Sequence, residues 1–462
     1  MYIPKPIVKS GFFFTPSNSD DKYPGTLTIS DGGRAELEIT SSKVAFISLN
    51  EREIGRLIGE VEGGYVTLEG CAYRSMYLPF GTPGKSLITA ETVFDGVGFN
   101  ELPLFSSLRF CVDGLSEWLG ESAFHINHAK SFEDTTITIQ RPKEVRCILP
   151  DGTEMEINIE MKVPGSIKFP SIELFQQAYI VVQPTEPKPL KFFQKLSHQL
   201  TRFFSFTIGK TVAIHSLSAK FEDDKLSELQ KRVSVYFRSL NGTDKAEFSR
   251  REMLLGYRSL APRFEALLGS WLNDYDNLMP ALHHHYSVQD GSHRYADTKF
   301  LAIAQAVEAL HRRTFDTRKW PKAEYKEKVQ AILAGCPEEE RVWLNGKLAY
   351  GNEISLAERL HQLIDRFGAV FGDEDAIHQI VRRTVNTRNY HAHYDPHGEA
   401  KALKGAALIA LTYHLRVLFT LSLLVRLGYT EEEAIKVADF DYLKRMLSTA
   451  KAIHEAGDYE GS

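Results

Sequence analysis

The chain has 462 residues, of which 43% are hydrophobic and 25% charged, as in an ordinary soluble globular protein with length for roughly two to four domains. Its net charge is −5, and residues 291–462 hold 24 basic and 24 acidic residues. The chain therefore has no overall positive charge that would attract nucleic acid non-specifically, and contact with RNA would need a local site. The four cysteines form no CxxC pair, which argues against a zinc ribbon, an iron–sulfur site and a secreted disulfide framework.

Two parts of the sequence bear on localisation. The start of the chain, MYIPKPIVKS, lacks a long apolar segment, so we expect no signal peptide and a cytoplasmic protein. Residues 406–424 are apolar enough to resemble a membrane span, but His414 and Arg416 lie at the centre, where a charge is costly in lipid. We expect a buried core helix there and no membrane partner.

Residues 1–185 read as a β-rich domain. Short runs of β-branched and aromatic residues recur, several with period two, and turn signals separate them. Asp151-Gly152 predicts a tight hairpin and Gly63-Gly64 a turn between strands, whereas residues 113–119 predict a short helix. This spacing favours a sandwich or barrel-like domain. The runs are GTLTIS (25–30), AELEIT (35–40), VAFISL (44–49), YVTLEG (65–70), TTITIQ (135–140), VRCIL (145–149), MEINIEM (155–161) and AYIVVQ (178–183).

Residues 186–290 read as a mixed α/β connector, which begins after the proline-rich QPTEPKPLK at 183–191. Helices are expected at 192–206 and 247–279. Strands are expected at 210–221 and 231–240, and these either complete the β domain or form a small second sheet.

Residues 291–462 read as all-α. Amphipathic segments joined by short polar loops predict an antiparallel helical bundle, so the fold class is α+β. The expected helices cover 296–313, 325–334, 354–371, 373–393 and 400–427, with one or two more at 430–455.

The predicted helix that starts near Asp373 is unusually cationic. Between residues 376 and 398 it contains three arginines, four histidines and a single acid, Asp395, and Pro396 predicts a helix end near Tyr394. At 100° per residue, an apolar stripe runs through Ile377, Val381, Val385, Arg388 and Ala392. Arg388 therefore needs a carboxylate, a phosphate or a partner surface, because an unpaired buried charge is costly.

Arg388 and His393 are a residue pair suited to cleaving RNA without a metal ion. An imidazole can move a proton near neutral pH while the 2′-OH attacks the neighbouring phosphorus, and a guanidinium can grip the phosphate oxygens as charge builds. The spacing alone favours an exposed cationic helix end or an arginine paired with a core carboxylate, because an arginine and a histidine five residues apart are common by chance.

The residues Arg388-Asn389-Tyr390-His391-Ala392-His393 have the form R-N-x-x-x-H, which resembles the R-x4-6-H signature of the HEPN superfamily (higher eukaryotes and prokaryotes nucleotide-binding). The segment FLAIAQAVEALHRR (300–313) resembles the first helix of its Apea-like branch. GEVEGGYVTLEGC (59–71) and SLRFCVDGLSEWLG (107–120) resemble that branch's β-rich partner, so most of the chain resembles the ApeA-type family of bacterial anti-phage defence.

This resemblance implies a metal-independent endoribonuclease of abortive infection, in which Arg388 and His393 are catalytic. It also implies a homodimer formed through the bundle, an RNA substrate, with transfer RNA as one candidate, and an N-terminal domain that senses infection, with a phage protein as a candidate trigger. We expect no cofactor and no metal. The alternatives are a non-catalytic dimeric scaffold that binds RNA or nucleotide, and an interaction protein that acts through its β domain.

Asn389, His391 and Glu308 are candidate supporting residues. The helical wheel places His391 closer than His393 to the face of Arg388, but the family register favours His393, and we expect the helix end near Pro396 to turn His393 inward. Glu308 either orients Arg388 or pairs with Arg312 one turn away. His283-His284-His285 predicts a loop or helix end and no metal site, because adjacent helical residues point apart.

Overall fold

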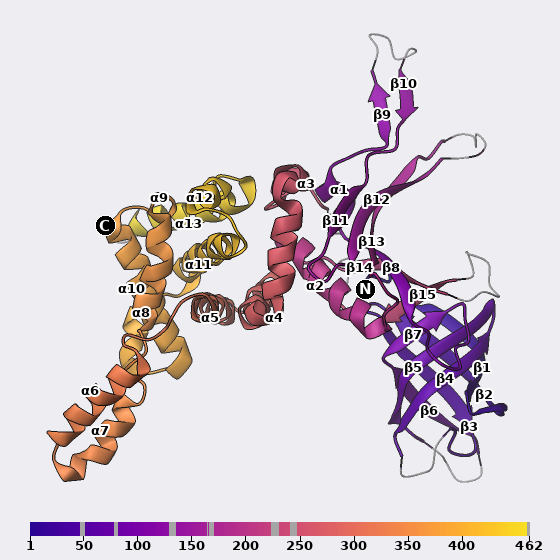
Figure 1. The fold of residues 1–462 in the computed structure, drawn as a ribbon, viewed down its shortest axis with the longest axis horizontal. Helices are drawn as coiled ribbons and strands as arrows, with labels where there is room; N and C mark the ends of the chain where they lie inside the picture. The colour runs from indigo at the N-terminus through magenta and orange to yellow at the C-terminus, as the bar shows by residue number, and fades with distance from the viewer. Residues whose placement is uncertain are drawn as a thin grey trace. The chain divides into compact units, whose positions relative to one another are not determined.

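The computed structural model describes residues 1–46, 51–77, 82–128, 135–163, 165, 171–222, 231–240 and 247–459. These form two compact units, Met1–Gly269 and Ser270–Ser462. The first unit is β-rich and the second is helical, which confirms the α+β fold class (Figure 1).

Six strands of the first unit close into a barrel. Their order is β5-β4-β1-β2-β3-β6, and β6 pairs again with β5. Alternation along β3 buries Ala35, Leu37 and Ile39 and exposes the residues between them, as a half-buried strand requires. The barrel form of the β-rich domain is thus confirmed. The strands are β1 (Ile7–Thr15), β2 (Asn18–Ser30), β3 (Arg34–Ser41), β4 (Glu53–Val61), β5 (Gly64–Ser75) and β6 (Gly84–Ala90).

The sheet continues beyond β5 as seven further strands in the order β7-β15-β14-β8-β13-β12-β11. Two of them, β14 and β15, come from the predicted connector and so complete the β domain. The predicted hairpin is present between β11 and β12, where Gly152 has a φ of 83°. The strands are β7 (Thr92–Asp95), β8 (Phe105–Val112), β11 (Val145–Ile148), β12 (Glu154–Lys162), β13 (Phe175–Gln183), β14 (Ile214–Phe221) and β15 (Arg232–Phe237).

Helices and a separate two-stranded hairpin complete the first unit. Strands β9 (Phe124–Asn127) and β10 (Thr136–Ile139) pair with each other and with no other strand among the described residues. Helix α2 (Leu190–Ile208) packs against β8 and buries Phe193, Phe203 and Phe204, and α1 (Leu115–Leu119) buries Trp118.

Some predicted elements differ from the structure. The helix expected at 354–371 is divided by a 3-10 turn at Asp365–Phe367, and the helix expected at 400–427 begins only at Gly405. The predicted strand at 44–49 lies partly outside the described residues, and its described part, 44–46, is not a strand. The predicted helix at 247–279 is wrong at its start: residues 247–256 contain only a 3-10 turn at Arg250–Glu252, before α3 (Tyr257–Leu260) and α4 (Phe264–Gln289). Met253, Leu254 and Leu255 are buried without a helix, and the Leu255 amide donates to the Thr207 carbonyl at 2.8 Å.

The second unit is a helical bundle around α11. This helix contacts α5, α8, α10, α12 and α13, whereas no described residue of α6 or α7 is buried, and these two extend from the other helices of the unit as a pair (Figure 1). The helices are α5 (Ala296–Thr314), α6 (Lys322–Ala334), α7 (Arg341–Leu348), α8 (Leu356–Ile364), α9 (Gly368–Phe371), α10 (Glu374–His393), α11 (Gly405–Arg426), α12 (Glu431–Ala438) and α13 (Asp441–Tyr459).

Helix α11 is long and apolar enough to span a membrane, and it alone has this property in the described part of the chain. Of its most apolar window, 72% is buried inside the fold, which confirms the expected core helix. Burial lowers the pKa of His414 to about 4, with further lowering by His454 and Arg383. His414 therefore stays neutral near pH 7 and adds no charge to this core.

The pKa of His414 predicts a loss of stability in acid. An unfolded chain takes up the His414 proton near pH 6.5, but the folded chain does so only near pH 4. Acidification through this window therefore favours unfolding, by up to roughly 2–3 kcal/mol. Thermal melts between pH 7.5 and 4.5 should show a shallower decline in Tm for His414→Gln than for the wild type. His397→Gln, which changes an exposed histidine, is the control, and equal slopes for all three proteins would contradict the prediction.

Candidate functional site

Helix α10 carries most of the predicted site residues. It begins directly after Asp373, as predicted, and the Asp373 carboxylate caps it by accepting a hydrogen bond from the Ala376 amide at 2.9 Å. It ends at His393, followed by Tyr394 in a left-handed conformation with a φ of 49°. The helix end predicted from Pro396 is therefore confirmed.

The buried face of α10 is rotated relative to the predicted stripe. Val385 and Arg388 are half-buried and Ala392 is exposed, so the predicted stripe opens toward solvent at its C-terminal end. Two threonines take the buried positions because their hydroxyls are satisfied: Thr384 donates to the Ile380 carbonyl, and Thr387 accepts from the Leu403 amide. Arg388 thus lies at the edge of the buried face. The buried residues are Ile377, Val381, Thr384, Thr387 and His391.

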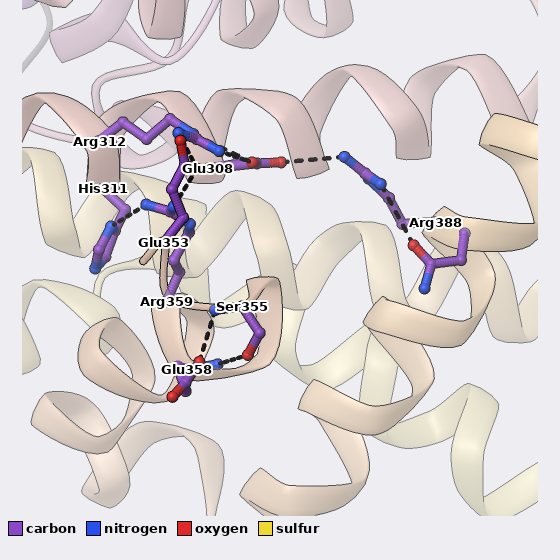
Figure 2. Close-up of polar contacts among 9 residues, drawn as sticks. Glu308, His311, Arg312, Glu353, Ser355, Glu358, Arg359 and Arg388 are labelled. Carbon is purple, nitrogen blue, oxygen red and sulfur yellow. Dashed lines mark hydrogen bonds and ion pairs between the residues drawn. The ribbon is translucent and has the colours of Figure 1, made fainter. Parts of the chain in front are cut away.

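Glu308 of α5 binds two arginines at once (Figure 2). Its Oε2 accepts from Arg388 at 3.4 Å, and its Oε1 accepts from Arg312, one turn along α5, at 3.2 Å. Both roles considered for Glu308 therefore occur together. The Glu308 side chain is 18% exposed and that of Arg388 32% exposed, so the pair is partly shielded and the guanidinium still reaches solvent. Arg388 also donates to the Asn389 side-chain oxygen at 3.3 Å.

The ion-pair network continues from Arg312 into α8. Glu353 accepts from Arg312 at 2.9 Å and from Arg359 at 3.3 Å, and the Arg359 side chain is only 2% exposed (Figure 2). The other side of Arg359 faces His311 Nδ1 at 3.4 Å, and His311 Nε2 lies 2.6 Å from the Gln362 side-chain oxygen. Burial lowers the pKa of His311, which favours the neutral ring that accepts from Arg359 at Nδ1 and donates to Gln362 at Nε2.

A capping box fixes the start of α8 and thereby the position of Arg359. The Ser355 hydroxyl accepts from the Glu358 amide at 3.2 Å, and the Glu358 carboxylate accepts from the Ser355 amide at 2.6 Å (Figure 2). These bonds, with Lys319, lower the pKa of Glu358 to about 2.

The two candidate histidines have opposite environments. His391 is 8% exposed, its ring lies against Phe300 and Tyr390, and neither ring nitrogen has a hydrogen-bond partner among the described residues. His393 is exposed, so the expectation that the helix end turns it inward is wrong. The reason is geometric: five residues of helix rotate His393 by about 140° from Arg388, and the turn at Tyr394 comes after His393.

The structure therefore brings Glu308, Arg388 and Asn389 into direct contact, but within one chain it leaves His393 on a different face of α10. Arg388 offers guanidinium donors beyond those used by Glu308 and Asn389, which suits an anionic oxygen. Among the described residues, no group of three His, Cys, Asp or Glu side chains is placed to hold a metal ion, and His283–His285 form no such group.

A cavity of about 740 Å³ lies elsewhere in the bundle, and Arg383 and His414 line it together with residues of α9, α11 and α13. Arg388, His393 and Glu308 do not line this cavity. Their site lies apart from this cavity, at the partly exposed edge of α10.

Sequence reasoning missed Glu353, Arg359 and His311. A signal for Arg359 was present, because its spacing to Leu356, Leu360 and Leu363 places it on the apolar face of α8. An arginine there requires a buried partner. Glu353 lies before the helix start, where no periodic pattern identifies a partner.

Comparisons with known proteins found no match among curated proteins and none among solved structures. Two family models do match. The model for Apea-like HEPN matches residues 301–433, which include Glu308, Arg388 and His393. The model for ApeA N-terminal domain 1 matches residues 9–271, more than half of the chain. The chain therefore belongs to the ApeA family, with an ApeA N-terminal domain 1 followed by an Apea-like HEPN domain.

Proposed function

We propose that the protein is a metal-independent endoribonuclease that acts in anti-phage defence. The observation that carries this proposal is Arg388, a partly exposed guanidinium held by Glu308 within the Apea-like HEPN match. A fixed guanidinium with unused donors is suited to the extra charge that a phosphate gains as a nucleophile attacks it. His393, five residues on, supplies an exposed imidazole for proton transfer.

The proposed reaction is internal transesterification. The 2′-oxygen forms a bond to the adjacent phosphorus, the bond from phosphorus to the 5′-oxygen breaks, and the products are a 2′,3′-cyclic phosphate and a 5′-OH. The His393 imidazole takes the 2′-OH proton, and the imidazolium then returns a proton to the leaving 5′-oxygen. Arg388 stays protonated throughout and binds the non-bridging oxygens.

We further propose that the site is shared between two copies of the chain. Because His393 lies about 140° around α10 from Arg388, one chain does not present both side chains to the same phosphate. A twofold dimer through the helical unit would bring Arg388 of one copy to His393 of the other, so that two such sites form in each dimer. In this arrangement the β-rich unit senses infection, for which a phage protein is the proposed trigger, and the protein acts in the cytoplasm.

The second candidate is a dimeric RNA-binding or nucleotide-binding scaffold without cleavage. The exposure of His393, and the lack of a described partner for its ring, favour this reading, because a catalytic base is usually held by another group. Cleavage assays distinguish the two functions.

Substitutions should separate the roles of the two histidines. His393→Ala should lower single-turnover RNA cleavage by at least about 10²-fold with an unchanged Tm, because the side chain is exposed and transfers a proton. Arg388→Ala should lower cleavage similarly and also shift the Tm, because Glu308 loses a partner. His391→Ala should mainly lower the Tm, since its ring is packed in the core.

The matched control is His397→Ala, an exposed histidine four residues beyond His393, which should cleave like the wild type. Should His391→Ala abolish cleavage at an unchanged Tm while His393→Ala stays active, the proton-transfer role would belong to His391.

Cleavage should need no divalent metal. We expect wild-type activity in EDTA and products whose 3′ ends resist 3′-adenylation until the cyclic phosphate is removed. The reason is that Arg388 and His393 supply charge stabilisation and proton transfer themselves, and the site presents no carboxylate cluster for Mg²⁺. Loss of activity in EDTA with recovery in Mg²⁺ would overturn this mechanism.

The active protein should be a dimer. Light scattering at micromolar concentration should give twice the 52.3 kDa chain mass, and specific activity should fall on dilution below the dimer dissociation constant. A protein that is monomeric at every concentration and equally active throughout would refute the shared site.

A further inference from the structure

Helix α10 presents one exposed face that is free of acidic residues. After Asp375 the helix has no aspartate or glutamate up to its end at His393, and it contains three arginines in that interval. The next acid, Asp395, lies beyond the helix end, where its carboxylate accepts from the His397 amide at 3.1 Å. This face therefore offers donors to an anionic partner without a competing carboxylate of its own.

The residues of this face line up on the helical wheel with His393. Positions 378, 382, 386, 389 and 393 lie within about 40° of Arg382, and Arg382 itself is within about 20° of His393. His378, Arg382, Asn389 and His393 are exposed and Asn386 is half-exposed, so the alignment is a surface stripe and we call these five residues the α10 stripe. Its length from Arg382 to His393 is roughly 16 Å, which is long enough to contact more than one phosphate of a single nucleic-acid strand.

Arg382 differs from Arg312 and Arg388 in its lack of ion pairs. Arg312 is bound by both Glu308 and Glu353, and Arg388 is bound by Glu308. No hydrogen bond or ion pair involves the Arg382 side chain in the described part of the chain. An exposed guanidinium without a carboxylate retains all of its donors and its full charge for a ligand.

We propose that the α10 stripe binds the backbone of single-stranded RNA next to the cleavage site, and that Arg382 contacts a phosphate other than the one that is cut. This inference rests on the proposed function, because it extends the site along the same helix from His393. Charge complementarity selects the occupant: a phosphate strand matches a linear, acid-free row of arginine, asparagine and histidine side chains. Arg382 is thus a substrate-binding residue that is separate from the chemical step.

The salt dependence of binding tests this inference. The probe is a short fluorescent 2′-O-methyl oligonucleotide, which has the phosphate backbone of RNA but no free 2′-OH for cleavage. In the full-length protein, Arg382→Gln should weaken binding about tenfold and reduce the slope of log affinity against log salt by about 0.7, the value for one phosphate contact on a single strand. Arg383→Gln is the matched control, because it removes the same charge from the adjacent position, which faces the bundle cavity.

Each outcome has a defined meaning. Equal slopes and affinities for Arg382→Gln and Arg383→Gln, or no binding of the probe by the wild type, would overturn the proposal. A shift in the dimer dissociation constant of Arg382→Gln with unchanged oligonucleotide binding would also overturn it, because the face would then be a protein interface. Binding with the expected slope change in a protein that cuts no RNA would support the stripe and contradict the proposed cleavage activity, so the two failures are distinguishable.

Discussion

The placement of Arg388 depends on one carboxylate, Glu308, that is shared by two guanidinium groups. Arg312 and Arg388 bind its two oxygens from opposite sides, and this ion pair links α5 to α10 beside the contact of Phe300 with His391 (Figure 2). Removing Glu308 would leave the partly shielded Arg388 without a carboxylate and Arg312 with Glu353 alone. The position of Arg388 is therefore a consequence of packing between helices that are far apart in the sequence.

The ion-pair network that includes Glu308 extends inward to Arg359, which is its most deeply buried charge. Three arginines share two carboxylates, so the five residues carry a net charge of +1, and the surplus lies at the partly exposed end because Arg359 is 2% exposed. His311 and Gln362 satisfy the remaining side of Arg359 without adding a charge. The bundle thus holds a cationic group at its surface by neutralising the charges beneath it, and this is the physical basis for assigning phosphate chemistry to Arg388.

Local signals allowed much of this fold to be predicted from the sequence. Pro396 marked the end of α10 and Asp373 its start, because proline restricts the residue before it and an aspartate caps an exposed amide. Long-range contacts were only partly predictable. Barrel closure depends on the pairing of β5 with β6, and Glu308 was expected to bind either Arg388 or Arg312, whereas its contact with both spans 80 residues of the chain and has no local signal. The helical wheel also misplaced the buried face of α10. Thr384 and Thr387 are polar residues, so the hydrophobic pattern leaves them out, but both are buried because their hydroxyls form hydrogen bonds with the backbone.

The central claim is that Arg388 of one copy works with His393 of another, and mixing two inactive variants tests it most directly. Arg388→Ala and His393→Ala chains are dissociated, mixed in equal amounts and reassembled. Random pairing makes about half of the dimers mixed, and in each mixed dimer one site would have both residues intact. The account predicts recovery of about one quarter of wild-type cleavage. A correctly mixed population that is no more active than either variant alone would contradict it.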